Sequence, residues 1–466
     1  MKSFLSLSVL FFSFLVCSAQ FTPSTNHINT QLEGSQTAYI KVPLNYQANS
    51  SDSISLFVRK FPARKTSEGS IWLISGGPGE SGASLYPLVD QFASIFPNLD
   101  IIIPDHRGTG LSAKICPNEE NIDSPNGIGL ANNEWGSCFN YMYTHQDYVK
   151  SFSITNAAKD LNYLIQKIST KGPKYVYAVS YGTQLALRMQ QLGSPQLDGL
   201  ILDSLVPLQN DEDNDLSHRS FVTNAVGNEV LNYYDSISQS EKSLTIKLTE
   251  ILRKEKEDQS FKNKLPQQKL SHLFGMMLNI PKVRNNIPSI INTLYEGDTS
   301  ALNQAVRDIM SFHVTYASDY QTFASSIPLA QVISSSENNL RPEIKKTELA
   351  QEDGNLLFTS PLAQLIAENS MPSYERDEYF AGTPLNLPPT LILHGTLDPK
   401  TSLNGADRHV LELSKFSSNI SYVKIKDAPH FIALFAPDGF GQAVKTFMNG
   451  KEASDYMIDD VGVELR

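Results

Sequence analysis

The chain has 466 residues, a length that fits two or three domains or one large domain with an insertion. Its acidic side chains outnumber its basic ones, 49 to 38, which gives a formal net charge of −11. This balance excludes the basic surface that nucleic-acid binding requires, so no nucleic-acid partner is expected.

Residues 1–19 have the pattern of a secretory signal peptide. Lys2 precedes an apolar stretch over 4–16, and small residues that end in Ala19 suit cleavage before Gln20. The alternative, a membrane anchor, needs about 20 apolar residues, whereas this stretch is shorter and interrupted by serines. No later segment is apolar enough to span a membrane. We therefore expect a mature protein without a membrane span, in the extracellular space or in a lysosome or digestive vacuole.

The cysteines and two sequons agree with the secretory route. Once Cys17 is removed with the signal peptide, Cys116 and Cys138 remain, and a lone pair in an oxidising compartment is most simply one disulfide. A metal site is disfavoured because no CxxC or nearby histidine pair supplies further ligands, so no metal and no cofactor are expected. Asn49 and Asn419 begin Asn-x-Ser sequons and are predicted glycosylation sites.

After the leader, the apolar pattern predicts an α/β fold. Segments 38–42 and 54–58 are strand-like and predict an opening hairpin. Short apolar runs then alternate with amphipathic helical segments such as 153–168 and 403–416. This alternation is typical of a doubly wound, mostly parallel sheet whose strands are buried on both faces. The predicted core strands are 71–74, 101–103, 175–179, 200–202, 391–393 and 422–425.

One long segment departs from this alternation. Between 206 and 387 no strand pattern recurs, and the sequence becomes polar, charged and helix-prone. We interpret 206–387 as a helical cap inserted into a core domain formed by 20–205 and 388–466.

Residues 175–187 combine strand, turn and helix signals around one serine. The apolar start of this segment meets Ser180-Tyr181-Gly182, and a helix-prone stretch follows. Such a turn holds the serine in strained geometry and raises its hydroxyl above the sheet edge. It resembles the nucleophile elbow of α/β hydrolases, with Ala178 at the first glycine position of Gly-x-Ser-x-Gly. Ser180 is the predicted nucleophile.

A serine nucleophile needs a histidine that takes its proton and a carboxylate that orients the histidine. In this fold the chain order is serine, acid, histidine, and Asp398 and His430 each follow a predicted strand in that order. Asp203 is a rival for the acid, although it also fits a buried turn or helix cap. His394 and His106 are rival histidines near strand ends. A structural hydrogen-bonding role is favoured for His394 because it lies on the same short loop as the predicted acid.

The oxyanion of an acyl-transfer intermediate needs backbone N–H donors. One donor normally comes from the residue after the nucleophile, here Tyr181, and one from the loop after the third core strand. That loop is Ser75-Gly76-Gly77-Pro78-Gly79, and Gly77 is the predicted donor. The glycines also fit a simple turn, but this turn lies where the oxyanion hole is required.

Taken together, these motifs resemble the prolyl aminopeptidase and tripeptidyl aminopeptidase family of serine exopeptidases. The chain departs from the family pattern at Ala178 and at Glu80, where the family often has glycine, and its cap contains no motif that we can align. The motifs that carry the resemblance are Gly-Gly-Pro-Gly at 76–79, Asp-His-Arg-Gly-Thr-Gly-Leu-Ser at 105–112, Ser-Tyr-Gly-Thr at 180–183, Gly-Thr-Leu-Asp at 395–398 and Pro-His at 429–430.

The resemblance implies an aminopeptidase that acts on peptides with a free N-terminus through an acyl-enzyme on Ser180. It also implies that Arg107 braces loops behind the active site. A carboxylate must pair with the substrate ammonium, and Glu80 or the acids of the loop 211–215 are candidates. The oligomeric state is not predicted.

Two alternatives remain open at this point. A carboxylesterase or lipase would use the same triad and oxyanion hole, because fold does not fix the substrate. A secreted binding protein that has lost its chemistry is the second alternative, although such proteins usually lack a triad residue.

Overall fold

The computed structural model describes residues 21–24, 32–48, 50–193, 195–238, 240–317, 324–450, 454–460 and 462–463. The predicted signal peptide at 1–19 and the predicted glycosylation site at Asn49 lie outside these residues. Asn419, the second predicted site, is exposed immediately before a strand. Among the helices of the described residues, none is both long enough and apolar enough to cross a membrane.

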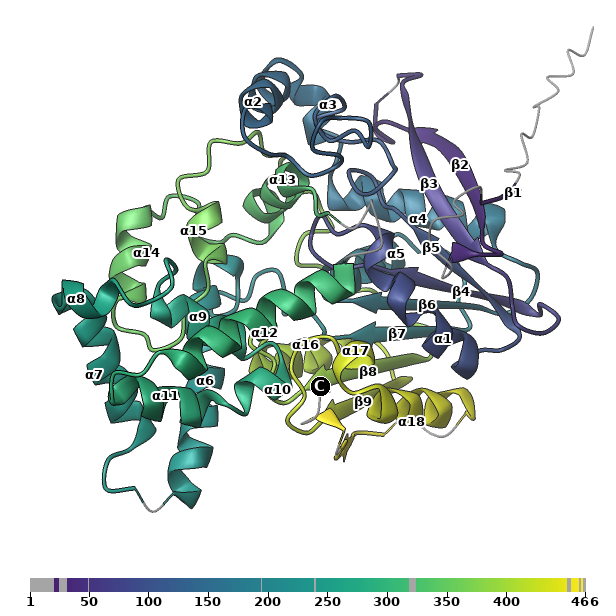
Figure 1. Cartoon of the computed structure of the whole chain (residues 1–466). Helices are drawn as coiled ribbons and strands as arrows, with labels where there is room; N and C mark the ends of the chain where they lie inside the picture. The colour runs from purple at the N-terminus through teal and green to yellow at the C-terminus, as the bar shows by residue number, and fades with distance from the viewer. Residues whose placement is uncertain are drawn as a thin grey trace, which may run out of the picture.

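A ten-stranded sheet runs through the molecule in the order β1-β2-β3-β5-β4-β6-β7-β8-β9-β10 (Figure 1). The pairs β1–β2, β2–β3 and β3–β5 are antiparallel, and every later pair is parallel. The strands are β1 (Thr22–Pro23), β2 (Gln36–Pro43), β3 (Ser53–Phe61), β4 (Gly69–Ile74), β5 (Leu99–Pro104), β6 (Lys174–Val179), β7 (Gly199–Asp203), β8 (Thr390–Gly395), β9 (Ile420–Ile425) and β10 (Tyr456–Ile458).

The predicted doubly wound, mostly parallel sheet is therefore confirmed. Each predicted strand lies inside an observed one, and the opening hairpin is formed by β2 and β3. The edge strands β1 and β10 were not predicted. They are two and three residues long, too short for an apolar alternation to be recognised.

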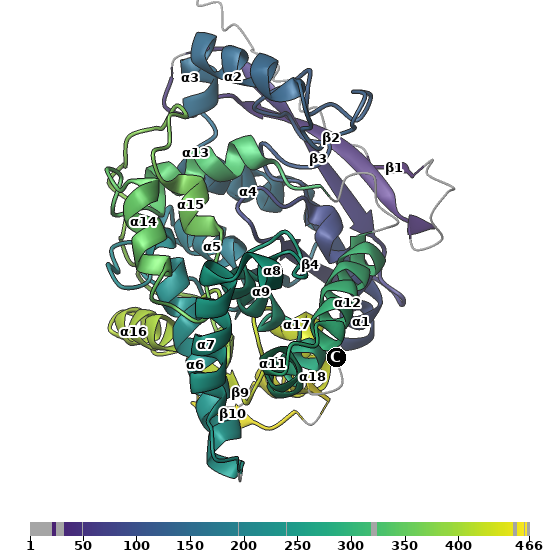
Figure 2. The ribbon, with the colours of Figure 1, turned by 60° about the vertical axis from the view of Figure 1, so that its left-hand side comes forward.

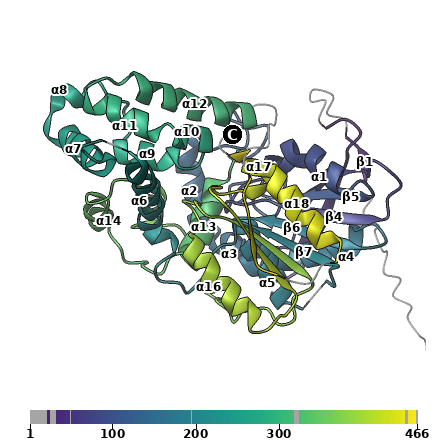
Figure 3. The ribbon, with the colours of Figure 1, turned by 90° about the horizontal axis from the view of Figure 1, so that it is seen from below.

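Helices cover both faces of the sheet, and this explains the continuous apolar runs. In β4, Ile71 and Leu73 pack on one side with η2 (Gly82–Leu88), α1 (Val89–Ile95), α17 (Ile432–Phe435) and α18 (Pro437–Met448). Trp72 and Ile74 pack on the other side with α4 (Ile154–Ile168), α5 (Tyr181–Gln191) and α16 (Leu403–Ser414). Figure 3 shows the two helical layers with the sheet between them. Neighbouring side chains of one strand thus enter different cores, and both must be apolar.

The segment between β5 and α4 forms a separate excursion at the edge of the core (Figure 1). It contains α2 (Glu134–Thr144) and α3 (Gln146–Lys150). The predicted disulfide is confirmed, since Cys116 is bonded to Cys138 of α2, and both cysteines are fully buried.

The Arg107 side chain braces the core, as the resemblance implied. Its Nε and Nη2 donate to the two carboxylate oxygens of Asp160 on α4 at 2.7 and 2.8 Å, and both side chains are buried. The same guanidinium donates to the carbonyls of Pro43, Leu44 and Ser151. These bonds tie the end of β2 and the segment before α4 to Asp160, and they use all five N–H groups of Arg107, which leaves no donor for a substrate.

Between β7 and β8 the described residues form helices and no strand, as expected for the cap (Figures 1 and 2). Most of these helices share an apolar core of their own, which Leu397 and Phe435 of the core domain join. The helices are η3 (Leu216–His218), α6 (Arg219–Ile237), α7 (Leu244–Glu257), α8 (Gln259–Lys262), α9 (Leu270–Met277), α10 (Pro281–Arg284), α11 (Ile287–Tyr295), α12 (Ser300–Ala317), α13 (Ile327–Glu337), α14 (Lys346–Asp353) and α15 (Leu362–Ile366).

Two buried polar contacts join the cap segment to the helices behind the sheet. Arg188 of α5 donates to Glu337 of α13 at 2.8 Å, with each side chain only 2% exposed, and Tyr374 donates to the second carboxylate oxygen at 2.8 Å. The second contact is between His409 of α16 and the carbonyl of Val206, at 2.7 Å from Nδ1. Burial lowers the pKa of His409 to about 4, so the ring is neutral and Nδ1 donates.

We predict that Glu337→Gln lowers the free energy of unfolding by about 3 kcal/mol, because it leaves the buried Arg188 charge without its main counterion. Urea denaturation measures this difference. Glu257→Gln is the control, since Glu257 pairs with Arg253 in a solvent-exposed position and its loss should change stability by less than about 0.5 kcal/mol. Equal effects of the two substitutions would contradict the proposed weight of the buried pair.

We also predict that His409 makes the protein less stable in acid. An unfolded histidine takes up a proton near pH 6.5, whereas folded His409 does so only near pH 4, so stability falls as the pH drops between these values. His409→Asn keeps an amide donor for Val206 and removes the titration. The loss of unfolding free energy from about pH 7 to about pH 4.5 should then shrink by about 2 kcal/mol. An unchanged difference between the two pH values would show that His409 does not titrate in this way.

Candidate active site

Ser180 lies at the sharp turn between β6 and α5. Its φ of 55° and ψ of −127° place a non-glycine residue in a strained region of backbone space. Its amide donates to the carbonyl of Asp203 at 3.0 Å, which fixes the turn against the end of β7. A Cβ on Gly182 would lie 2.7 Å from the carbonyl oxygen of Ser75, so only glycine allows α5 to start this close to the loop after β4. The predicted turn geometry is thus present.

Asp398 and His430 are in direct contact. Oδ2 of Asp398 is 2.8 Å from Nδ1 of His430, and both residues are buried. Burial raises the pKa of Asp398, but the neighbouring His430 and several hydrogen bonds outweigh it and hold this pKa well below its usual range. The carboxylate is therefore ionised and accepts the Nδ1 proton, which leaves Nε2 of His430 free to accept a proton.

A close approach of two loops makes this contact possible. A Cβ on Gly395, at the end of β8, would lie 2.3 Å from the carbonyl oxygen of Ala428, so a side chain there would separate the loops. Leu397 also donates its amide to Ala428 at 3.0 Å. The loop that carries Asp398 and the loop that carries His430 are thereby held together.

Thr401 is a positioning residue that the sequence analysis missed. Its Oγ1 donates to Oδ2 of Asp398 at 2.6 Å, and its amide donates to Oδ1 at 2.9 Å. The carbonyl of Thr401 accepts from Nε2 of His394 at 2.9 Å, so His394 holds this loop from behind. His394 is fully buried and has the structural role that its position suggested. Asp398 closes an Asx turn with the amide of Lys400 at 2.8 Å, and the turn-forming aspartate followed by a threonine three residues later was a usable signal.

Asp203 makes no hydrogen bond or ion pair with His430 among the described residues; it anchors the chain that follows His430. Its carboxylate accepts from the amides of Ile432 and Ala433 at 2.8 and 2.9 Å and from Tyr177 Oη at 2.8 Å. This is the buried helix-cap role that was the alternative for Asp203, at the start of α17. Because its carbonyl also accepts from Ser180, Asp203 links the nucleophile turn to the histidine loop.

Among the described residues, Ser180 and His430 share no hydrogen bond. They are connected indirectly, through hydrogen bonds to residues at the end of β7. Ser204, the residue after Asp203, has its hydroxyl 2.8 Å from the amide of Phe431. The two side chains thus follow β6 and β9, on either side of β7 and β8, at the carboxyl edge of the parallel sheet. In open α/β sheets, active sites form at this edge.

The two predicted oxyanion donors are available. Among the described residues, the amides of Gly77 and Tyr181 donate to no protein acceptor. Gly77 is exposed, whereas the Tyr181 side chain is buried and lies with its ring centre 5.8 Å from that of His106. Free amides on both sides of a serine are the arrangement that an oxyanion needs. His106 is itself buried, and burial lowers its pKa to about 4, so it is a neutral neighbour of the site and not a base in it.

Glu80 lies beside the nucleophile. A Cβ placed on Gly76 would be 3.0 Å from the Cβ of Ser180 and 3.4 Å from Oε2 of Glu80, so the carboxylate and the serine flank the same backbone. Glu80 is half-buried, and among the described residues its carboxylate makes no hydrogen bond and no ion pair within 4.0 Å. It attracts the ammonium of Lys400 without forming an ion pair with it, so it can still accept a further cation.

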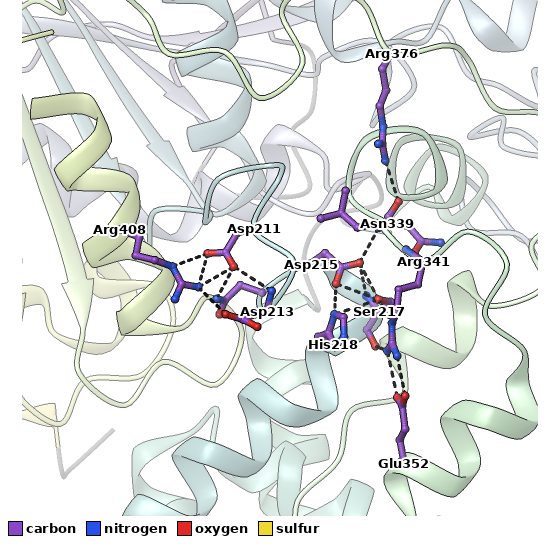
Figure 4. Close-up of polar contacts among 12 residues, drawn as sticks. Asp211, Asp213, Asp215, Ser217, His218, Asn339, Arg341, Glu352, Arg376 and Arg408 are labelled. Carbon is purple, nitrogen blue, oxygen red and sulfur yellow. Dashed lines mark hydrogen bonds and ion pairs between the residues drawn. The ribbon is translucent and has the colours of Figure 1, made fainter. Parts of the chain in front are cut away.

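Three of the four acids of the loop 211–215 contact other parts of the protein. Figure 4 shows Asp211 and Asp213 directed at Arg408 of α16, at 2.6 and 3.6 Å. Asp215 turns the other way and accepts from Ser217, from the amide of Leu340 and from His218. These carboxylates join the start of the cap to α16 and to the segment after α13. Asp211 and Asp215 are therefore not free to bind a substrate ammonium, whereas Glu212 is exposed and makes no hydrogen bond or ion pair among the described residues.

The described residues contain no cluster of three or more metal-ligating side chains.

Comparisons with known proteins agree with this architecture. The family model described as alpha/beta hydrolase fold matches residues 69–437. The chain is 28% identical over 188 residues to the Escherichia coli (strain K12) protein named "Putative hydrolase YuaR". That match covers 38% of this chain and 37% of the relative, so the chain spans little more than a third of the relative's length.

Two solved structures illustrate the structural matches. Epoxide hydrolase I of potato (Solanum tuberosum) is 14% identical, with coverage of 89% of this chain and 99% of that chain and a TM-score of 0.40. A thermophilic esterase from Thermogutta terrifontis is 14% identical, with coverage of 88% and 98% and a TM-score of 0.35.

Proposed function

The chain belongs to the alpha/beta hydrolase fold family, and on that premise we propose that it is a serine hydrolase that acts as an aminopeptidase on short peptides. The observation that carries the proposal is the buried 2.8 Å contact between Asp398 and His430, at the same sheet edge as the strained Ser180 turn. This arrangement supplies a nucleophile, a base and an orienting acid in the chain order of the family.

Each residue has a defined part in the reaction. Oγ of Ser180 attacks the substrate carbonyl, and Nε2 of His430 takes the hydroxyl proton as the new C–O bond forms. Asp398 stays ionised, keeps the other ring proton on Nδ1 and stabilises the imidazolium. His430 then gives its proton to the leaving amine as the C–N bond breaks. Water attacks the acyl-enzyme with His430 again as base, and Ser180 is restored.

Negative charge develops on the carbonyl oxygen during both attacks. The free amides of Gly77 and Tyr181 are the donors for this oxygen. Donors of this kind are effective because they are fixed by the backbone and need no reorganisation when the charge appears.

The aminopeptidase assignment is supported by Glu80 and by the sequence resemblance. An N-terminal ammonium that is bound near the scissile bond needs a carboxylate partner. Glu80 has an unpaired carboxylate next to Ser180, whereas Asp211, Asp213 and Asp215 are occupied. An ester hydrolase would use the same triad and would not need Glu80.

The proposal includes the secretory route, because the disulfide between Cys116 and Cys138 is stable in an oxidising compartment. The signal peptide at 1–19 and the sequons at Asn49 and Asn419 point to the same route. An extracellular or lysosomal location follows from it.

We predict that the mature protein removes residues from peptides with a free N-terminus and that Ser180→Ala lowers kcat by at least about 10⁴-fold. The substrates are matched peptides with free and acetylated N-termini and one short-chain aryl ester, with products identified by mass. Thermal unfolding of both proteins verifies that the variant is folded. Ester turnover without peptide cleavage would replace the aminopeptidase by a carboxylesterase, and equal turnover by the variant would reject Ser180 as nucleophile.

We predict that Glu80→Gln lowers kcat/KM for free peptides by about 10-fold to 100-fold, since a charge-assisted hydrogen bond is worth about 1.5–3 kcal/mol. The neutral aryl ester has no ammonium, so its turnover measures any general damage to the site. Glu257→Gln is the control variant, on an exposed cap helix. A loss of the same size for the ester and for the peptide would show that Glu80 does not select the ammonium.

A further inference from the structure

The first turn of cap helix α6 packs against the loop that carries the proposed catalytic acid. Oγ1 of Thr223 lies 3.1 Å from the carbonyl oxygen of Pro399 and 2.9 Å from that of Arg219 within the helix, so the two carbonyls share its single proton. Pro399 follows Asp398 directly, so Arg219, one helical turn before Thr223, belongs to the part of the cap that borders the triad.

Arg219 is a buried cation that forms no hydrogen bond or ion pair through its guanidinium with any described residue. The described residues contain five buried arginines: Arg59, Arg107, Arg188, Arg219 and Arg284. Within that part of the chain, Arg219 alone among the five makes no hydrogen bond or ion pair through its guanidinium, and its Nε is buried and unpaired. The residue is only 9% exposed. A buried charge is costly unless an opposite charge or acceptor compensates it, so this guanidinium lacks an anion.

The neighbouring carboxylates are already used. Arg219 interacts electrostatically with Asp398 and Asp215, and burial lowers its pKa to about 10 in spite of both. Asp398 is occupied by His430 and Thr401, and Asp215 by Ser217 and the amide of Leu340. Neither forms an ion pair with Arg219 within 4.0 Å among the described contacts. Among the described residues, the nearby carboxylates attract Arg219 but none is paired directly with its guanidinium.

A second cation, Lys400, lies on the loop that carries Asp398. Lys400 retains solvent-exposed area although protein atoms crowd around its ammonium, and desolvation lowers its pKa. Glu80 and Asp398 attract this ammonium, and Arg219 repels it. Within 4.0 Å, however, the described carboxylates form no ion pair with Lys400. Two cations that repel one another, one of them reachable by solvent, are an arrangement that an added anion would stabilise.

We propose that Arg219 and Lys400 form a subsite that binds a carboxylate of the substrate beside the catalytic triad. The inference rests on the proposed hydrolysis at Ser180 and extends it to the substrate class. Guanidinium forms bidentate hydrogen bonds with a carboxylate, and the lysine ammonium adds a mobile charge that can follow the ligand. The carboxylate is either an acidic side chain or the C-terminus of a short peptide, since both present the same group.

The charge layout then selects short or acidic peptides. Glu80 lies on the side of the Gly76 loop and can accept the substrate ammonium, whereas Arg219 and Lys400 lie on the side of the Asp398 loop. A substrate with a positive and a negative end meets a complementary charge at each. A long peptide without acidic side chains has an ammonium for Glu80 but no carboxylate for Arg219 and Lys400.

The test compares kcat/KM for substrate pairs that differ by one carboxylate. One pair exchanges Gln for Glu within the peptide, and the other exchanges a C-terminal amide for a free C-terminus. We expect the parent protein to prefer the acidic member of at least one pair by about tenfold or more, and the pair identifies the source of the carboxylate. The proposal is overturned if the parent shows no preference in either pair.

The variants assign the preference to the two cations. Arg219→Met should bring the ratio within a pair close to one, and this ratio is independent of any change in overall activity. Arg253→Gln, on an exposed part of α7, is the matched control and should keep the parent ratio. If Arg219→Met does not fold, Lys400→Met, which removes the exposed cation, should reduce the same ratio. An unchanged ratio in the folded variant would overturn the proposal.

A neutral acetate aryl ester and its succinate counterpart separate this inference from the proposed function. If no peptide is cleaved, the aminopeptidase proposal fails, and the ester pair still decides whether a carboxylate is bound. A succinate preference that Arg219→Met removes would support the subsite even then. Equal turnover of the two esters, with no peptide preference, would reject it.

Discussion

The backbone and side chain of Asp203 hold the candidate active site together. Its carbonyl accepts from the amide of Ser180, and its carboxylate accepts from the amides of Ile432 and Ala433. Burial raises the pKa of this carboxyl, while its hydrogen bonds act in the opposite direction. The nucleophile turn and the histidine loop are separated by about half the chain, yet one residue at the end of β7 sets their relative position. These hydrogen bonds fix the strained Ser180 turn and the His430 loop in position relative to each other.

The cap contributes Arg219 to the proposed carboxylate subsite. Its segment is anchored behind the sheet by the buried Arg188–Glu337 pair, and its first long helix reaches the Asp398 loop through Thr223. These contacts fix where Arg219 lies, although Arg219 itself pairs with no described residue. A buried cation without a direct ion-pair partner lowers the stability of the folded protein, and a bound anion would compensate it. The packing that holds the cap against the core domain therefore also places Arg219 at the proposed carboxylate subsite.

Acidic residues that looked alike as candidates for an ammonium site have different partners in the structure. The loop 211–215 is the densest acidic cluster in the cap, and it suggested an ammonium site. Asp211 and Asp213 instead meet Arg408, and Asp215 caps the turn before α6. Glu80, a single acid that departs from the family pattern, keeps an unpaired carboxylate beside Ser180. The number of charges in a segment did not indicate their availability, because availability depends on partners contributed by remote helices.

The sequence by itself determined the core strands of the sheet and the order of the candidate catalytic residues along the chain. Apolar runs buried on both faces identify the core strands, and Ser180, Asp398 and His430 follow three of them in the chain order of the family. A lone cysteine pair likewise predicted the disulfide. Only the tertiary structure decided which aspartate meets His430, how Thr401 and His394 support it, and which charges stay unpaired. These outcomes depend on contacts between residues far apart in the chain, and the local patterns that specify helices and strands carry no information about such partners.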